Sequence, residues 1–246
     1  MCEKCRLENP AHLPGSTRRA VLGFAAASAI ALALGRPASA KEKKPPPKPD
    51  NVLSPDAALE RLRQGNQRYI DGVAKRHDFK HEREALVGGQ NPYAGILSCA
   101  DSRIAPEYAF DSGRGDLFVC RVAGNFANTE SIASLEYAVA ILKTPSILVL
   151  GHDSCGAVDA TIKSLRDNTT LPGQLPSLVT GLEPAVKAVL QDPGDLLANA
   201  TRRNVIDTVA KLKSATPILS AAVEARKLKV VGGIYRLRDG RVDMIA

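Results

Sequence analysis

The stretch SILVLGHDSC, residues 146–155, decides the fold, because a short apolar run in it ends at polar residues. The run Ile147–Leu150 has the length and composition of a buried strand, and His152 follows it. The stretch GILSCADSR, residues 95–103, repeats this arrangement with Cys99 at the end of its apolar run. Open α/β sheets place their sites beyond the carboxyl ends of such strands. We therefore expect the two stretches to meet at one edge of a sheet.

The rest of the chain alternates between short apolar runs and helical patterns. Strands are predicted at Tyr93–Ser98, Asp116–Val122, Ser146–Leu150 and Lys229–Tyr235. A turn at Asp239-Gly240 then predicts a hairpin with an antiparallel edge strand. This alternation predicts an α/β fold with a mainly parallel central sheet, four strands plus the antiparallel edge strand, flanked by helices.

The first forty residues have the pattern of an export signal. A twin-arginine pair lies in TRRAVL (residues 17–22), an apolar stretch covers residues 20–34, and ASA at 38–40 is a cleavage site. A signal that stays in the membrane is the alternative, but the apolar stretch is shorter than the ~20 residues that span a bilayer. We expect export by the twin-arginine route to the periplasm, with no stable membrane insertion after cleavage.

Three regions follow from that pattern: a signal peptide at 1–40, a Pro/Lys-rich linker at 41–53 and one catalytic domain at 54–246. Without the signal, the chain has 28 basic and 24 acidic side chains, a net charge of +4. That excess is small and the chain contains no Trp, so nucleic acid binding is not supported.

The five cysteines divide into three groups. Cys2 and Cys5 lie before the signal and would be removed with it. Cys120 lies inside an apolar run and is predicted to be a buried core thiol. Cys99 and Cys155 remain, and zinc would protect these two thiols in an oxidising compartment.

Cys99, His152 and Cys155 are good zinc ligands, and three protein ligands leave the fourth position for water. A structural zinc site usually has four ligands, and no fourth candidate has suitable spacing, so the pattern favours a catalytic metal. His77 and His81 stand four residues apart, which is also a metal-site spacing, but their charged neighbours indicate a surface pair.

Asp101 and Arg103 add a charged pair beside the first thiol. The carboxylate could orient a zinc-bound water, and the guanidinium could keep the carboxylate ionised. The alternative is an ordinary structural ion pair at a strand end. Zinc lowers the pKa of its water toward ~7, although two thiolates blunt that effect. The residues alone therefore indicate hydration or hydrolysis of an electrophile.

Taken together, the motifs resemble the β-class carbonic anhydrases from about residue 54 to the C-terminus. The motifs that carry the resemblance are CADSR (99–103), RVAGN (121–125), Glu136-Tyr137, GHDSCG (151–156) and GGIY (232–235).

This resemblance implies zinc-dependent, reversible hydration of carbon dioxide to bicarbonate and a proton. One Zn²⁺ per subunit would be held by Cys99, His152 and Cys155. Asp101 and Arg103 would form the dyad that orients the zinc-bound hydroxide. Hydrolysis of carbonyl sulfide or carbon disulfide on the same scaffold is the alternative reaction, and a non-catalytic zinc-binding module is the alternative class.

The resemblance also implies a homodimer or tetramer whose substrate pocket is completed at the subunit interface. Gln90, Phe118, Tyr137 and Gly156 match the positions that line that pocket, the first three from or near the partner. The predicted helix at Ser54–Asp71 would be the N-terminal arm for dimerisation.

Some members of the family let the carboxylate that corresponds to Asp101 bind zinc directly. Those members tend to carry a Trp three residues before the first Cys, where this chain has Ile96. We therefore expect the open form, in which water is the fourth ligand.

Overall fold

The structure, a computed structural model, describes residues 51–246. The predicted twin-arginine signal, its cleavage site and most of the predicted linker lie outside the described residues. Cys2 and Cys5 do so as well. Export and processing therefore stay predictions.

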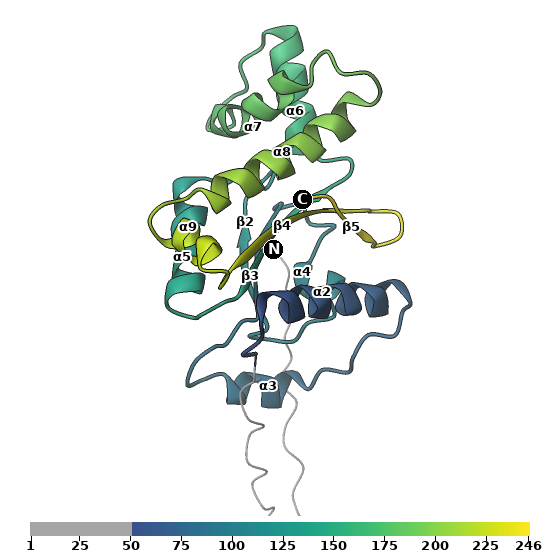
Figure 1. Cartoon of the computed structure of the whole chain (residues 1–246). Coiled ribbons are helices and arrows are strands. Elements are labelled where there is room, and N and C mark those ends of the chain that lie inside the picture. The colour runs from purple at the N-terminus through teal and green to yellow at the C-terminus, as the bar shows by residue number, and fades with distance from the viewer. Residues whose placement is uncertain (1–50) are drawn as a thin grey trace, which may run out of the picture. The chain divides into compact units, whose positions relative to one another are not determined.

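A five-stranded sheet forms the centre of the described chain, in the order β2-β1-β3-β4-β5 (Figure 1). Four strands are parallel: β1 (Ala94–Ser98), β2 (Leu117–Arg121), β3 (Ser146–His152) and β4 (Lys229–Tyr235). The fifth, β5 (Val242–Met244), runs antiparallel to β4 at the edge. The predicted sheet is confirmed, including its antiparallel edge strand.

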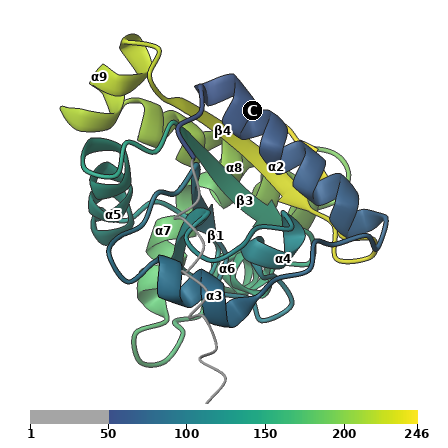
Figure 2. The same ribbon diagram turned by 90° about the horizontal axis from the view of Figure 1, so that it is seen from below.

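Helices cover both faces of this sheet. The helices of the described chain are α2 (Pro55–Ile70), α3 (Phe79–Ala85), α4 (Pro106–Ala109), α5 (Thr129–Ala140), α6 (Gly156–Asp167), α7 (Pro176–Ala188), α8 (Leu196–Lys213) and α9 (Ile218–Glu224). Apolar side chains of α5, α8 and α9 pack with β1, β3 and β4 in one core cluster. Helices α2 and α4 lie on the opposite face (Figure 2), and their apolar side chains belong to a second core cluster. Every residue of β1 and β3 is buried, as expected for parallel strands that are covered on both sides.

Helix α8 approaches the sheet closely because the strands carry glycine beneath it. A Cβ on Gly232 of β4 would lie 2.6 Å from Cγ1 of Val205, and one on Gly151 of β3 would lie 2.7 Å from Cγ2 of the same valine. Any side chain at either position would push the helix away, and the strand ends under it would lose their cover.

Helix α2 begins and ends where the sequence predicts. The Ser54 hydroxyl accepts a hydrogen bond from the Ala57 amide at 3.2 Å, and Pro55 occupies the first turn. Its apolar side packs against its own sheet, with Leu59 and Leu62 buried. The apolar side of α2 is therefore already packed within its own chain. If the helix also acts as a dimerisation arm, as predicted, it must contact the second subunit through its other side. Contact with a second subunit stays a prediction.

The two spaced histidines do not form a joint site. His77 precedes α3 and its Nδ1 lies 3.0 Å from Glu82 Oε1, whereas His81 pairs with Asp78 at 2.5 Å. Both histidines are partly exposed, and each has its own carboxylate partner. The geometry agrees with the predicted surface pair.

The prediction that Cys120 is a buried core thiol is wrong. The residue is only half-buried, because β2 is the outermost strand and has a neighbour on one side only. Burial still raises the pKa of this thiol above its ordinary value. Within residues 51–246, no helix combines the length and the apolar character needed to cross a membrane.

Candidate active site

The candidate active site lies at the carboxyl ends of β1 and β3, which are adjacent and parallel. Cys99 follows β1, His152 is the last residue of β3, and Cys155 precedes the first turn of α6. Their ligand atoms all lie within 4.8 Å of one another, and all three residues are buried. Three residues that are far apart in the sequence thus meet as the strand pattern predicts.

The distance between the two sulfurs suits a shared ion. Cys99 Sγ and Cys155 Sγ are 4.0 Å apart. A disulfide requires about 2.05 Å. Two thiolates bound to a tetrahedral zinc ion, each at about 2.3 Å, would stand roughly 3.8 Å apart. The two cysteines are free thiols whose spacing fits zinc without rearrangement.

His152 is oriented for metal binding by its backbone neighbour. Its Nδ1 lies 2.8 Å from the carbonyl oxygen of Asp153, so Nδ1 carries the proton and donates it to that carbonyl. Its Nε2 is buried and has no hydrogen-bond partner among the described residues. A histidine whose one nitrogen is fixed by a carbonyl and whose other nitrogen is free is the usual arrangement of a metal ligand.

The environment of Cys99 favours the thiolate. A hydrogen bond from the Cys155 thiol lowers the pKa of Cys99, and contacts with His152 and with the Gly124 amide add to this effect, whereas burial opposes it. The Gly124 amide donates to Cys99 Sγ at 3.3 Å. Gly124 has φ +83°, and a Cβ there would lie 2.7 Å from Cδ1 of Leu182, so only glycine fits. Thiolate is the form that binds metal.

Asp101 and Arg103 form a two-pronged ion pair beside the cluster. Arg103 Nε donates to Asp101 Oδ1 at 2.9 Å, and Nη2 donates to Oδ2 at 2.7 Å. The Arg103 amide also donates to Oδ1 at 2.9 Å. Hydrogen bonds from Arg103 hold the pKa of Asp101 well below its usual range, although burial opposes the shift. The carboxylate is therefore ionised at neutral pH.

The Asp101–Arg103 pair connects the loop after β1 with the loop after β3. Asp101 Oδ2 lies 3.8 Å from the free Nε2 of His152, and Arg103 Nη2 donates to the carbonyl of Ser154 at 3.2 Å. The carboxylate is thus close to the metal-ligand atoms while both of its oxygens are bonded to Arg103. This arrangement can hold a cation between two sulfurs and a nitrogen and present a fixed anion next to it.

The four predicted pocket residues are only partly brought together. Gly156 is adjacent to Cys155 at the first position of α6. Phe118 and Tyr137 contact each other, with ring centroids 6.3 Å apart. Gln90 is exposed and lies outside the helices and strands. Their role in a substrate pocket stays a prediction.

Asp153 is a supporting residue that the sequence analysis did not single out. Its Oδ1 accepts a hydrogen bond from the Leu237 amide at 3.0 Å, which ties the ligand loop to the segment after β4. Its carbonyl fixes His152. Its position inside the HDSC motif could have indicated a supporting role. Its contact with Leu237 could not be predicted, because the two residues are 84 positions apart in the sequence.

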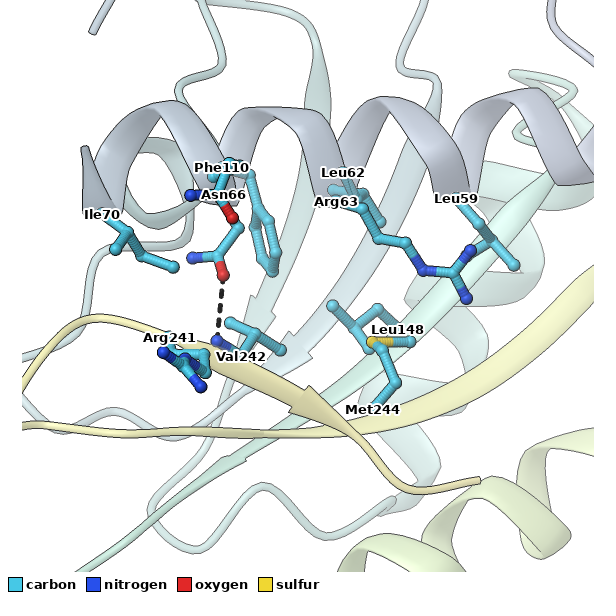
Figure 3. A pocket seen from close by; sticks show the side chains of 11 residues that line it. Leu59, Leu62, Arg63, Asn66, Ile70, Phe110, Leu148, Arg241, Val242 and Met244 are labelled. Atoms are coloured by element: carbon cyan, nitrogen blue, oxygen red, sulfur yellow. Dashed lines mark hydrogen bonds between the residues drawn. The ribbon is translucent and has the colours of Figure 1, made fainter. Parts of the chain in front are cut away.

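A hollow of about 460 Å³ lies elsewhere, between α2 and the β4–β5 hairpin (Figure 3). Its wall combines apolar side chains, such as Leu59, Leu148 and Met244, with the polar side chains of Arg63 and Arg241. Asn66 in this wall is structural: its oxygen accepts from the Val242 amide at 2.9 Å, and its nitrogen donates to two backbone carbonyls. None of the cysteine and histidine ligands lines this hollow. The group of cysteine and histidine side chains at the strand ends is thus separate from this hollow.

Comparisons with known proteins agree with this site. A family model described as carbonic anhydrase matches residues 94–242. Carbonic anhydrase 2 of Mycobacterium tuberculosis strain H37Rv is 39% identical over 189 residues, which cover 76% of this chain and 91% of the relative. A carbonic anhydrase of Mycolicibacterium smegmatis is 38% identical over 196 residues, 78% and 93% of the two chains.

Solved structures show the same fold. The β-carbonic anhydrase CcaA is 30% identical, with a TM-score of 0.61, over 77% of this chain and 92% of that one. A β-carbonic anhydrase from Sordaria macrospora, described as tetrameric, is 24% identical with a TM-score of 0.62, over 77% and 98% of the chains. The second likeness is one of fold alone. The chain belongs to the β-class carbonic anhydrases.

Proposed function

We propose that this chain catalyses the reversible hydration of carbon dioxide at a zinc ion held by Cys99, His152 and Cys155. The observation that carries the proposal is the buried Nε2 of His152, which has no hydrogen-bond partner among the described residues. The ligand atoms of His152 and of the two free thiols all lie within 4.8 Å of one another, and Nε2 is 3.8 Å from the ionised Asp101. Zinc, when bound, supplies a water of lowered pKa as a nucleophile near neutral pH. Everything else in the reaction depends on the chain's own side chains.

Asp101 is the residue that we assign to orientation of the nucleophile. Its carboxylate can accept a hydrogen bond from the attacking water and so direct the water's lone pair at the carbon of carbon dioxide. Arg103 has two tasks in this proposal. It keeps Asp101 ionised, and its fork fixes both carboxylate oxygens, so that the acceptor does not rotate away. The same two bonds support the open form, in which Asp101 does not bind the metal.

We also propose that a second subunit completes the substrate pocket. Strand β2 is an edge of the sheet, and the apolar residues beside it are exposed: Tyr137 is 49% exposed and Ile141 is 62% exposed. Exposed large apolar side chains beside a sheet edge are typical of an interface. Phe118 and Tyr137 lie beside this edge. If a second subunit docks there, these two side chains would lie at the interface and could line a pocket shared by both subunits. Gln90 and Gly156 are assigned to the pocket by family resemblance.

Export by the twin-arginine route to the periplasm is a further part of the proposal, and it is supported by the sequence pattern of residues 17–40. A variant with both arginines changed, Arg18→Lys with Arg19→Lys, should remain in the cytoplasm. Fractionation of cells and N-terminal sequencing of the exported chain test this. A mature chain that does not begin near Lys41 contradicts the predicted cleavage site.

The decisive experiment is stopped-flow hydration of carbon dioxide by the chain that starts at Lys41, with its zinc content measured on the same sample. We expect one zinc per chain and rapid hydration. A zinc-loaded chain without hydration activity contradicts the proposal. In that case release of hydrogen sulfide from carbon disulfide would indicate the alternative hydrolase, and inertness toward both substrates would indicate a non-catalytic zinc protein.

A further inference from the structure

Arg121 makes an unusual set of contacts with the loop that carries Asp101. It is the last residue of β2, and its side chain donates three hydrogen bonds to backbone carbonyls. Nε donates to the carbonyl of Cys99 at 2.9 Å, and Nη2 donates to the carbonyls of Asp101 at 2.7 Å and Ile104 at 3.0 Å. One guanidinium thus holds three carbonyls of a single loop, residues 99–104.

The sheet register places Arg121 at this position. In the parallel pair of β1 and β2, Arg121 is paired with Ser98, the residue directly before the loop. Beyond that pair the loop has few backbone ties to its neighbour. The Ala100 amide donates to the carbonyl of Val122 at 3.3 Å, and a turn closes between the Ile104 amide and the carbonyl of Asp101 at 3.2 Å. The loop therefore depends on a side chain for much of its fixation.

Convergence of three carbonyl oxygens on one point is unfavourable unless a cation lies between them, because their partial negative charges repel one another. Arginine suits this place better than lysine, because its planar fork presents several N–H groups in fixed directions, whereas lysine presents one compact charge. A loop path with its carbonyls turned inward toward Arg121 is thereby stabilised.

The two arginines of the site hold different parts of the same residue. Arg103 bonds the carboxylate of Asp101, and Arg121 bonds its backbone carbonyl. The bonds from Arg103 can fix the direction of the Asp101 carboxylate only if the backbone of Asp101 is itself held in place. Without Arg121, the Asp101–Arg103 pair would remain intact but could move as a unit relative to the cysteine and histidine ligands.

We propose that Arg121 is a positioning residue for the hydration reaction: it sets where Asp101 stands relative to Cys99, His152 and Cys155. This inference rests on the proposed function, because the position of Asp101 matters only if Asp101 orients the nucleophile. Arg121 bonds the backbone carbonyl of Cys99 but none of the ligand atoms, and the Gly124 amide holds the Cys99 sulfur independently, so removal of Arg121 should leave metal binding in place.

The experiment compares the zinc-loaded wild type with Arg121→Lys, Arg121→Ala and a matched control, Arg203→Ala. Arg203 is an exposed arginine of α8 that pairs with Asp207 one turn away, far in sequence from the site. Three quantities are measured: zinc content, kcat and KM for carbon dioxide hydration, and hydrogen exchange of the amides of residues 99–105 by mass spectrometry. The exchange measurement does not depend on activity.

We expect Arg121→Ala to keep its zinc, to lose kcat by roughly 10- to 100-fold, the range seen when a supporting hydrogen-bond partner is removed, and to change KM little. Amides in the loop should exchange faster. Arg121→Lys should fall between this variant and the wild type, and Arg203→Ala should match the wild type in every measurement.

The inference is overturned if Arg121→Ala retains the kcat of the wild type, or if its loop amides exchange no faster. If Arg121→Ala fails to fold, Arg121→Lys decides: a folded, zinc-loaded lysine variant with unchanged kcat also overturns the inference. An inactive zinc-loaded wild type contradicts the proposed function itself, so the two failures are distinguishable.

Discussion

Two of the aspartate–arginine pairs in the described chain have similar chemistry but lie at different places. One is Asp101 with Arg103, after β1, and the other is Asp111 with Arg68, which joins the segment after α4 to α2. In both pairs the arginine Nε and a carboxylate oxygen are in direct contact, at 2.9 Å and 2.5 Å. Each aspartate has a pKa below its usual value. Taken alone, the pairs would be hard to tell apart.

Their surroundings differ. The Asp111 side chain is 1% exposed, and its second oxygen accepts the Lys75 amide at 2.8 Å and lies 4.0 Å from His77 Nε2. The carboxylate thus holds the α2–α3 connection. Arg103 is 51% exposed, and its partner Asp101 stands beside a cluster of metal-ligand atoms. An ion pair thus becomes functional through what lies next to it. Each pair, or its neighbours, can be altered separately by substitution.

Removal of a metal ligand should have the largest effect. We expect Cys155→Ala to lose its zinc and all measurable hydration, because a site with two protein ligands binds the ion far more weakly. The Asp101–Arg103 pair would then be an ordinary ion pair. Cys120→Ala is the matched control, since it removes another cysteine that lies outside the cluster, and it should keep both zinc and activity. Metal analysis and stopped-flow assays measure the effects, and an active, zinc-loaded Cys155→Ala would refute the ligand assignment.

Neutralisation of the first pair should have the next largest effect. Asp101→Asn keeps the size of the side chain but loses its charge and one of its two acceptor oxygens, so neither the pair with Arg103 nor the charged acceptor for the attacking water is kept. We expect hydration to fall by roughly 100-fold or more, with zinc content unchanged. The same substitution in the other pair, Asp111→Asn, should leave kcat at the wild-type level. Equal losses in the two variants would show that Asp101 has no special role.

Much of this contrast can be read from the sequence. The apolar runs before Cys99 and His152 predict strands, and the rule that sites lie beyond strand ends brings the two stretches together. The observed β3 extends two residues further than predicted, because Gly151 and His152 pair with Ile234 and Tyr235 of β4. A search for apolar runs does not detect these two residues as part of the strand, because neither glycine nor histidine continues the apolar run.

The supports of each pair are not readable in the same way, because they come from distant parts of the chain. Arg68 and Asp111 are 43 residues apart, and nothing local to either residue predicts their contact. The three carbonyls that Arg121 holds are backbone atoms, which carry no sequence signal of their own. Sequence patterns predict which groups perform the chemistry, whereas the fold determines how firmly they are held.

Loss of charge in the second pair should show in stability. Asp111→Asn removes the charge that Arg68 pairs with, and the single oxygen of the asparagine can accept from Arg68 or from the Lys75 amide but its NH2 group faces the other donor. We expect the free energy of unfolding in urea to fall by about 2 kcal/mol, as for other buried, charge-assisted hydrogen bonds. Asp101→Asn should cost less stability, because Arg103 stays in contact with water. A reversed order of the two stability losses would contradict the structural role that we assign to Asp111.

The smallest predicted effect is the acid dependence of that stability. Burial raises the pKa of Asp111, but hydrogen bonds from Arg68 and the Lys75 amide outweigh it and lower the pKa below its ordinary value. The folded state then binds this proton less readily than the unfolded state does, so the contribution is fully present above about pH 4 and is lost as the pH falls through the folded-state pKa. Unfolding free energies of the wild type and Asp111→Asn, measured between pH 3 and 7, should differ most above pH 5 and converge toward pH 3. His77 Nε2 lies 4.0 Å from Asp111 Oδ1, so His77 is replaced by Gln in both proteins of this comparison. The other carboxylates are common to both proteins and cancel in the difference. A gap that stays constant over this range would mean that the charge of Asp111 contributes nothing, and that its pair with Arg68 is held by packing alone.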